Sequence, residues 1–421
     1  MIYFVYNRLL RITLRVFFKH IHVSNVENIP NNKPIIIAAN HPGAFLDPIL
    51  IACALHRPVS FLVRGDVFKS KLICTIFSWF RMYPVYRKDE GYENIEKNHD
   101  THDKVTEILK RNGIVVVFCE GYSASNRRLR TILKGTARMG MQTAMVENKD
   151  VLIVPAGITY SHKTNFRKSA LLDFSKPIAV KDFENEYLQH PQKAFVGITA
   201  ELERRLHDHF VEIKREECDL VTELNLNYYR NIENLSPLPV YISNTKKLDA
   251  ERSISEKIND LFETDSSQYK DFERSNRHYQ EALKEYQCDD LGVVSKGPGL
   301  VELIFLVLGI PFFILGVLYW GVPYLIAKNI ADKRVTRVDF HDSLMVNIIT
   351  ILFACFIGIS VLVSSCFVGL YGFLIAFLLP VIGVFSGWYY DTLLRIYFVF
   401  KAFKHKEILL GMRKKLEQYL P

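Results

Sequence analysis

The sequence predicts an α/β domain, in which helices flank a mixed, partly parallel sheet, followed by a helical extension and a C-terminal helical membrane region. Residues 34–185 alternate short runs rich in Val and Ile with helix-like stretches, a pattern typical of such sheets. Residues 186–298 are polar, highly charged and mostly helical in pattern. Beyond them, residues 303–327 and 343–390 contain no charged side chain, which is typical of membrane segments.

The α/β domain is expected over residues 23–185. Its strand-like runs are PIIIAA, VSFLV, IVVVF and VLIVPAGITY, at residues 34–39, 59–63, 114–118 and 151–160. Its helix-like stretches are residues 47–55, 98–112 and 133–148. In the extension, over residues 186–298, the segment SPLPVYISN interrupts the helical pattern.

Residues 1–22 predict an amphipathic helix. Their basic residues recur every three or four positions, so a helix carries them along one stripe, and apolar side chains cover the rest; they are Arg8, Arg11, Arg15 and Lys19. This pattern favours an interfacial helix on an anionic membrane, and the alternative is a helix that packs on the domain. A cleavable signal peptide is not expected, because its apolar region would be free of charge.

The region 299–390 is expected to enter the membrane. As one helix, residues 343–390 would be roughly 70 Å long, about twice the thickness of a bilayer core. They are therefore expected to fold back within the small-residue stretch 364–372, which gives two spans at residues 344–364 and 369–389.

The first apolar run, residues 303–327, contains Pro311 and Pro323 and is expected either to span or to be re-entrant. Basic residues follow it at Lys328, Lys333, Arg334 and Arg337, and more occur in the basic amphipathic tail, residues 391–421. Both basic segments should lie on the cytoplasmic side. We therefore favour a re-entrant run, which leaves the α/β domain on the cytoplasmic face.

Composition narrows the class of protein. The formal net charge is +8, from 53 Lys and Arg against 45 Asp and Glu, and this modest, dispersed excess does not indicate nucleic-acid binding. It suits an anionic membrane surface. The seven cysteines form no CxxC pair, so we expect free thiols in a reducing compartment.

A candidate catalytic pair follows the first predicted strand, in the segment NHPGAFLDP. His41 lies at the carboxyl end of that strand, where ligands of open α/β sheets usually bind. A neutral imidazole there can remove a proton from an attacking alcohol, and the Asp47 carboxylate would fix its tautomer. The alternative is structural: Asp47 caps the next helix, and His41 occupies a turn.

This segment resembles the first sequence block of the glycerolipid acyltransferases, the family of lysophosphatidate and glycerol-3-phosphate acyltransferases. The commonest form of that block has four residues between His and Asp, and this sequence has five. The longer spacing is similar to the branch that contains the fungal glycerol-3-phosphate and dihydroxyacetone-phosphate acyltransferases. The turn must then bulge by one residue, and we expect Gly43 to absorb the bulge.

Three further segments resemble later blocks of the family, in the family's order, so that the resemblance covers about residues 34–160. MYPVYRKDEG resembles the second block and supplies Arg87. VVVFCEGYSAS resembles the third, with Glu120 and Gly121 in place, but Cys119 replaces its usual proline and Ser123 its usual arginine. VPAGITY resembles the fourth and supplies Pro155.

The resemblance implies transfer of a fatty acyl group from acyl-CoA or acyl carrier protein to a hydroxyl of glycerol-3-phosphate or 1-acylglycerol-3-phosphate. It implies that His41 is the general base and that Asp47 orients it. The substrate-binding residues it implies are Arg87, Glu120, Gly121, Ser123, Lys134 and Pro155. Arg127, Arg128 and Arg130 could add positive charge for a phosphate, or form a solvated basic loop.

No metal and no cofactor besides the acyl donor is expected. The expected partners are membrane lipids, the acyl donor and a glycerol-phosphate-type acceptor, and no nucleic acid. Two alternatives stay open: an acyltransferase that acts on another acceptor, such as an aminoacyl lipid, and a non-catalytic membrane scaffold that retains the fold.

Overall fold

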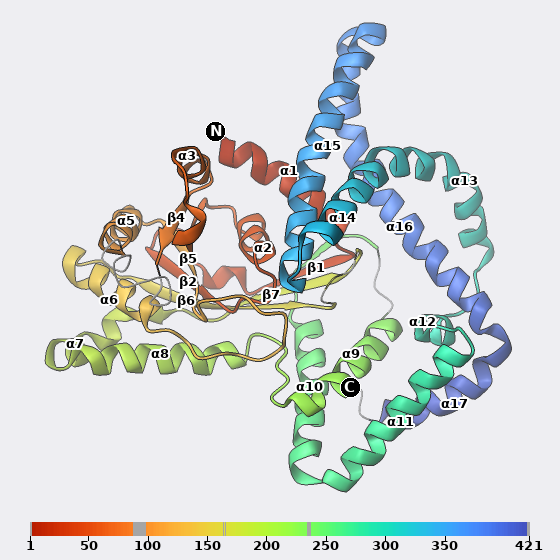
Figure 1. Ribbon diagram of the computed structural model, residues 1–421, viewed down its shortest axis with the longest axis horizontal. Coiled ribbons are helices and arrows are strands. Elements are labelled where there is room, and N and C mark those ends of the chain that lie inside the picture. The colour runs from red at the N-terminus through yellow and green to blue at the C-terminus, as the bar shows by residue number, and fades with distance from the viewer. Residues whose placement is uncertain (1, 87–97, 163, 165, 234–236, 419–421) are drawn as a thin grey trace.

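The computed structural model describes residues 2–86, 98–162, 164, 166–233 and 237–418 (Figure 1). The strands are β1 (His20–Ser24), β2 (Ile35–Ala39), β3 (Val59–Arg64), β4 (Met82–Val85), β5 (Ile114–Phe118), β6 (Leu152–Tyr160), β7 (Ser169–Phe174), β8 (Ile178–Ala179) and β9 (Tyr241–Ile242). The helices up to the extension are α1 (Ile2–Phe17), α2 (Leu46–Ala54), α3 (Lys71–Trp79), α5 (Asn98–Lys110), α6 (Gly135–Glu147), α7 (Glu184–Gln189) and α8 (Pro191–His207). Those that follow are α9 (Asp219–Ile232), α10 (Lys246–Thr264), α11 (Ser266–Glu285), α12 (Asp290–Val294), α13 (Leu300–Gly316), α14 (Val322–Arg334), α15 (Val338–Val368), α16 (Ile375–Ala402) and α17 (Lys406–Glu417).

The strands form one sheet in the order β4-β3-β5-β2-β6-β7-β1-β9, and β8 pairs with β6. Only the pairs of β6 with β7 and with β8 are antiparallel among the described strands. The predicted fold class, a mixed sheet flanked by helices, is confirmed. Each strand-like run named above is a strand, and each helix-like stretch contains a helix.

Both faces of the sheet centre are buried, which explains why β2 is a continuous apolar run. Ile35, Ile37 and Ala39 face a core shared with α1, α2 and the membrane helices α14 and α15. Ile36 and Ala38 face the opposite core, which contains α5, α6 and α8. Helix α8 therefore covers the sheet, and the boundary expected at residue 185 cuts through the α/β domain.

The N-terminal boundary also differs from the expectation. The first helix ends at Phe17 rather than residue 22, and β1 follows it as a fully buried strand. β1 pairs with β7 on one side and with β9 on the other, so the segment 237–244 contributes a strand to the same sheet. Local pattern could not show this, because these pairings join distant parts of the chain.

The C-terminal half of α1 packs on the domain, which was the alternative to an interfacial helix. Leu10, Leu14 and Phe17 are buried in the core that α1 shares with the sheet. Its N-terminal residues remain exposed, as Phe4 and Val5 show. The helix also packs against α15 and α16, so it joins the sheet to the membrane region.

The expected cytoplasmic tail is part of the extension. Residues up to Ala402 continue α16, and α17 packs against α11 in a core that also contains α9 and α10. Arg413 on α17 is fully buried and donates to Asp290 at 2.7 Å. The apolar face of the predicted amphipathic tail therefore packs on the extension, and the sequence pattern does not name these partners.

Three described stretches are long and apolar enough to cross a membrane by length and composition: Leu300–Arg334, Val338–Leu374 and Phe377–Glu417. α15 and α16 form a hairpin that projects from the rest of the molecule (Figure 1), and its turn, Gly369–Leu374, overlaps the end of the stretch predicted to fold back.

The first apolar run is a single bent helical path. It rises along α13, bends near a π-helical turn at Val317–Gly321, and descends along α14 toward the α/β domain (Figure 1). π-helical turns and proline are recognised causes of such bends. The path starts near α16, where Arg395 donates to the Lys296 carbonyl, and it ends near the α/β domain, where Arg337 donates to the Ser123 carbonyl. The re-entrant course of this run stays a prediction.

The buried His22 makes the stability of the fold depend on pH. Neither of its ring nitrogens has a hydrogen-bond partner among the described residues. Burial, with Lys247 next in effect, lowers its pKa from 6.5 to about 3. The unfolded chain therefore binds a proton that the folded chain does not between these two values, so stability is fully present above pH 6.5 and falls as the pH falls toward 3.

We expect the free energy of unfolding to fall by up to ~1.4 kcal/mol per pH unit in this window. Thermal unfolding of the purified protein at about pH 7 and about pH 5 measures it. His22→Leu should flatten the pH dependence, whereas the same change at the exposed His56 should not. An unchanged pH dependence in His22→Leu would refute this origin.

Candidate active site

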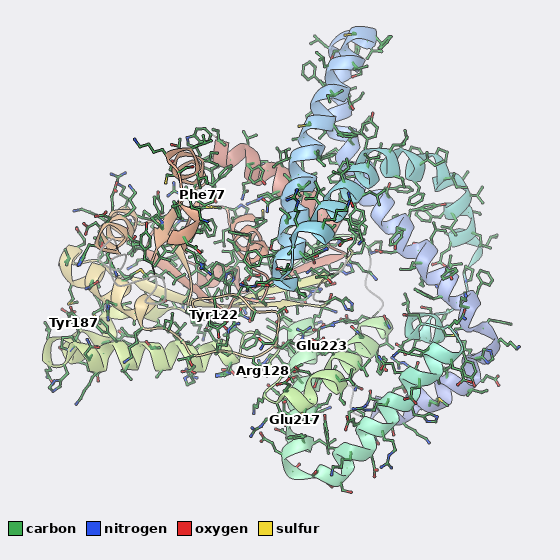
Figure 2. The ribbon with its side chains drawn as sticks, in the orientation of Figure 1. Phe77, Tyr122, Arg128, Tyr187, Glu217 and Glu223 are labelled. Carbon is green, nitrogen blue, oxygen red and sulfur yellow. The ribbon has the colours of Figure 1, made fainter. Side chains whose placement is uncertain are left out.

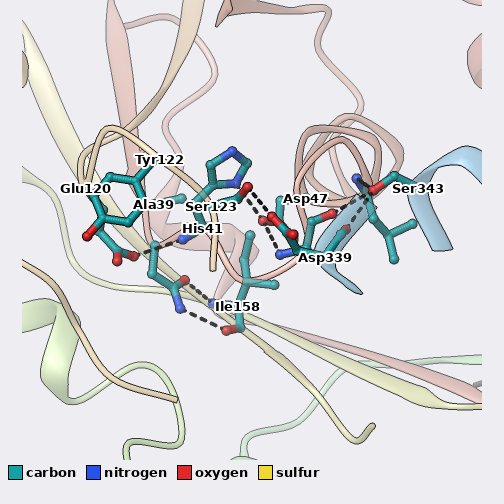
Figure 3. Close-up of polar contacts among 12 residues, drawn as sticks. Ala39, His41, Asp47, Glu120, Tyr122, Ser123, Ile158, Asp339 and Ser343 are labelled. Carbon is teal, nitrogen blue, oxygen red and sulfur yellow. Dashed lines mark hydrogen bonds and ion pairs between the residues drawn. The ribbon is translucent and has the colours of Figure 1, made fainter. Parts of the chain in front are cut away.

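The candidate site lies at the carboxyl ends of β2 and β5, where two turns meet (Figure 3). One turn runs from Asn40 at the end of β2 to α2, and the other follows β5 from Glu120. Asn40 is buried and makes two hydrogen bonds to Ile158 of β6: its amide donates to the Ile158 carbonyl at 3.0 Å, and the Ile158 N–H donates to Asn40 Oδ1 at 2.7 Å. The first turn is thereby fixed to the sheet.

The structure brings His41 and Asp47 together. His41 Nδ1 and Asp47 Oδ2 are 2.7 Å apart. The imidazole stacks on Phe118, with ring centroids 3.9 Å apart. The His41 side chain is 17% exposed, and no described residue bonds its Nε2. That nitrogen is therefore available to a ligand, while Nδ1 faces the carboxylate.

Asp47 is fully buried, and both of its oxygens are engaged. Oδ2 also accepts the Gly43 N–H at 2.8 Å, and Oδ1 accepts the hydroxyl of Tyr160 at 2.7 Å. Burial, with the neighbouring Asp47 next in effect, raises the pKa of Tyr160 well above its usual value, so Tyr160 remains a donor. Asp47 lies within α2, whose cap is Phe45, so it does not cap the helix as the alternative required.

The five-residue spacing is accommodated at Ala44 rather than at Gly43. Ala44 has φ 45°, in the left-handed region, while Gly43 is not among the positive-φ glycines. Gly43 is needed for space instead. A Cβ there would lie 2.6 Å from the Tyr160 ring and 2.7 Å from Asp47 Oδ1. The expectation that Gly43 absorbs the extra residue is thus wrong. Gly43 is required by the close approach of Tyr160, which the local sequence does not show.

Glu120 supports the site from the second turn. Its Oε1 accepts the backbone N–H of His41 at 3.0 Å, and its Oε2 accepts Arg130 Nε at 2.5 Å. Burial raises the pKa of Glu120, while Arg130 acts in the opposite direction. Gly121 has φ 81° and closes the turn through its N–H to Phe118. Glu120 therefore holds the turn that carries His41.

The other predicted binding residues are distributed differently. Ser123 is buried, and its hydroxyl donates to Asp339 at the start of α15. Lys134 is exposed at the cap of α6. Pro155 is buried inside β6, paired with Ala38, and does not line the cavity described below. Arg87 lies outside the described residues.

The three arginines expected to face a phosphate or solvent are paired with carboxylates. Arg127 bonds Glu223, and Arg128 bonds Asp219, both on α9. Figure 2 places Arg128 and Glu223 where the α/β domain meets the extension. Arg130 bonds Glu120, as described. The ion pairs of Arg127 and Arg128 connect the second turn to the extension, and local sequence could not indicate them.

A polar cavity of about 40 Å³ lies beside the first turn. Gly43, Leu46, Tyr160, Lys168 and Asp342 are among its lining residues. Lys168 is almost fully buried, and its ammonium group lies 4.5 Å from the centre of the Tyr160 ring. Burial lowers the pKa of Lys168, against the effect of Asp342. The described residues contain no cluster of side chains that could hold a metal ion.

Comparison with known proteins gives matches to the α/β domain. Residues 20–159 match the family model described as Acyltransferase. Glycerol-3-phosphate O-acyltransferase 2 of Saccharomyces cerevisiae is 25% identical over 153 residues, covering 36% of this chain and 21% of that protein. Glycerol-3-phosphate O-acyltransferase 1 of the same yeast is 22% identical over 250 residues, covering 39% of this chain and 33% of that protein. The alignments thus span only a fifth to a third of these relatives.

Among solved structures, the 1-acyl-sn-glycerophosphate acyltransferase PlsC of Thermotoga maritima is similar over 48% of this chain and 80% of that chain. The sequence identity is 18% and the TM-score is 0.33.

Proposed function

We propose that the protein is a glycerolipid acyltransferase, which transfers a fatty acyl group from acyl-CoA or acyl carrier protein to a hydroxyl of glycerol-3-phosphate or 1-acylglycerol-3-phosphate. The match of residues 20–159 to the family model described as Acyltransferase supports this proposal, as do the yeast relatives. The observation that supports this most directly is the His41–Asp47 pair, at 2.7 Å, with His41 Nε2 unbonded among the described residues. The yeast relatives are named as glycerol-3-phosphate O-acyltransferases, which supports a glycerol-phosphate acceptor.

The proposed chemistry requires only the side chains of His41, Asp47 and Tyr160 and the two substrates. His41 Nε2 takes the proton of the acceptor hydroxyl as its oxygen attacks the thioester carbonyl carbon. The new C–O bond forms, the C–S bond breaks, and the imidazolium returns the proton to the leaving thiolate. Asp47 stabilises the imidazolium through Nδ1, and the Tyr160 hydroxyl holds Asp47 in place.

The three long apolar helices indicate a membrane protein. We propose that the acyltransferase domain lies on the cytoplasmic face, where acyl thioesters are made. The last turn of α14 and the loop that follows it carry basic residues, and this loop contacts that domain through Arg337 and Ser123. Because basic loops favour the cytoplasmic side, this contact supports the proposed orientation.

The acceptor is tested by assaying purified protein with labelled acyl-CoA and acyl carrier protein. The acceptors compared are glycerol-3-phosphate, 1-acylglycerol-3-phosphate, dihydroxyacetone phosphate and an aminoacyl lipid. We expect turnover with the glycerol phosphates. Turnover of the aminoacyl lipid alone would contradict the proposed acceptor, and no turnover with any acceptor would favour a non-catalytic scaffold.

The phosphate is proposed to bind Arg87, so Arg87→Ala should raise the KM for glycerol-3-phosphate about 10- to 100-fold, the usual range for a lost hydrogen bond to a charged group. The KM for the acyl donor should not change. The matched control is Arg111→Ala, since Arg111 is an exposed residue paired with Glu107 just before β5. An unchanged KM for glycerol-3-phosphate in Arg87→Ala would refute this assignment.

A further inference from the structure

The N-terminal end of the membrane helix α15 lies against the turn that carries the catalytic pair (Figure 3). The Ser343 hydroxyl donates to the Gly43 carbonyl at 2.9 Å and accepts the Leu46 N–H at 3.1 Å. Gly43 and Leu46 both lie between His41 and Asp47 in the sequence. A single buried hydroxyl, from a residue 300 positions away, therefore closes this turn.

One helical turn earlier on α15, Asp339 holds the second turn of the site. Its carboxylate accepts the hydroxyl of Ser123 and, at 2.7 Å, Arg337 Nη2. Arg337 in addition donates to the Ser123 carbonyl at 2.8 Å. Both Ser123 and Asp339 are buried. The turn that contains Glu120 is thus bonded to the same helix as the turn that contains His41.

A third residue of α15 reaches toward the catalytic carboxylate. Asp342 forms an ion pair of 2.5 Å with Lys168, and both side chains are at least 95% buried. The Lys168 ammonium group lies against the Tyr160 ring, and the Tyr160 hydroxyl donates to Asp47. Asp342 therefore connects, through two neighbours, to the group that orients His41.

These three residues lie at positions three and four apart on one face of α15, so the helix presents them together. We infer that Asp339, Asp342 and Ser343 are positioning residues, and that the acyltransferase site is complete only when α15 is seated on it. This inference rests on the proposed function for its catalytic readout. It assigns to the membrane region a role in the geometry of the site, beyond anchoring the domain.

The physical basis is that the first turn contains a strained residue, although its own hydrogen bonds join Leu46 to Gly43 and Gly43 to Asp47. Ala44 adopts a left-handed conformation, which is unfavourable for a residue with a Cβ and persists only where the surroundings impose it. Ser343 bonds the residues on both sides of Ala44, so it supplies part of that constraint. A displacement of about 1 Å in a reacting group can reduce a rate by roughly 100-fold.

The test compares three variants of the full chain, purified in lipid nanodiscs. Ser343→Ala removes both bonds to the turn, and Ser343→Thr keeps the hydroxyl. Thr350→Ala is the control, because Thr350 is another buried hydroxyl of α15, and its hydrogen bonds are to Thr13 and to the Val346 carbonyl rather than to the catalytic turn. We expect kcat to fall about 10- to 100-fold in Ser343→Ala with both KM values within twofold, recovery in Ser343→Thr, and little change in Thr350→Ala.

Hydrogen exchange provides a readout that does not need turnover. Peptides covering residues 41–47 should exchange faster in Ser343→Ala than in the wild type or in Thr350→Ala, because the Leu46 N–H then keeps only its bond to the Gly43 carbonyl and the turn loses its bonds to α15. Asp339→Asn, which preserves shape, provides a second variant should Ser343→Ala fail to fold. It should lower kcat in the same way.

The outcomes separate the two proposals. If the wild type is active and Ser343→Ala keeps its kcat, or if Thr350→Ala loses as much, the positioning role is refuted while the proposed function stands. If the wild type acylates no acceptor, the proposed function is refuted. Hydrogen exchange then decides whether α15 constrains the turn. Unchanged exchange of residues 41–47 in Ser343→Ala would refute this constraint.

Discussion

His41→Ala should lower the rate of acyl transfer by about 10²–10⁴-fold, the range that general acid–base catalysis contributes. The variant removes the group whose Nε2 faces the proposed substrate position, and it leaves Asp47 bonded to Gly43 and Tyr160. The fold should persist, because the imidazole is partly exposed and makes one ring contact, with Phe118. The measurement is turnover of labelled acyl thioester with saturating acceptor.

The control is His56→Ala, since His56 is an exposed histidine of the same domain. It should retain wild-type turnover. Turnover of His41→Ala within a factor of ten of the wild type, with intact expression and unfolding temperature, would remove His41 from the role of base. An inactive wild type would instead favour the scaffold interpretation.

Arg413→Met should destabilise the protein by about 3–5 kcal/mol, the usual effect of removing one partner from a buried ion pair. Arg413 is fully buried, donates to Asp290 at 2.7 Å, and donates to the Tyr228 carbonyl at 2.7 Å. The methionine would fill much of the space but would leave the buried Asp290 carboxylate without its cation. The free energy of unfolding in denaturant, measured by helical circular dichroism, gives the loss.

Lys414→Met is the matched control, because Lys414 is an exposed residue of the same helix. It should change the free energy of unfolding by less than about 0.5 kcal/mol. The double variant Asp290→Asn, Arg413→Met should lose less than Arg413→Met alone, because the buried charge is then absent. An equal loss in Arg413→Met and Lys414→Met would show that the tail does not belong to the folded extension.

The sequence predicted the features of this site that are local. His41 and Asp47 are six residues apart, and the strand that precedes them is a plain apolar run. Their pairing could therefore be expected from the motif. Tyr160 and Ser343, which hold the turn, are 113 and 300 residues from the groups they bond, and no local pattern marks them.

Charge patterns were less informative than apolar patterns. A helix with an apolar stripe must bury it, so the existence of the helices in the extension and the tail followed from periodicity. Periodicity did not show which basic residue is buried. Arg413 and Lys414 are adjacent basic residues in the sequence and differ only in the partner that the fold provides. The same holds for Arg127, whose carboxylate partner is on α9.

One core joins a face of the sheet to α1, α14 and α15, and this has a consequence for synthesis of the chain on the ribosome. Residues 20–207 emerge before α15, since chains are made from the N-terminus and their domains generally fold in that order. Until α15 has been made, Ile35, Ile37 and Ala39 lack part of the layer that covers them. The nascent domain therefore exposes an apolar surface, and this core is complete only once α15 has packed on the sheet.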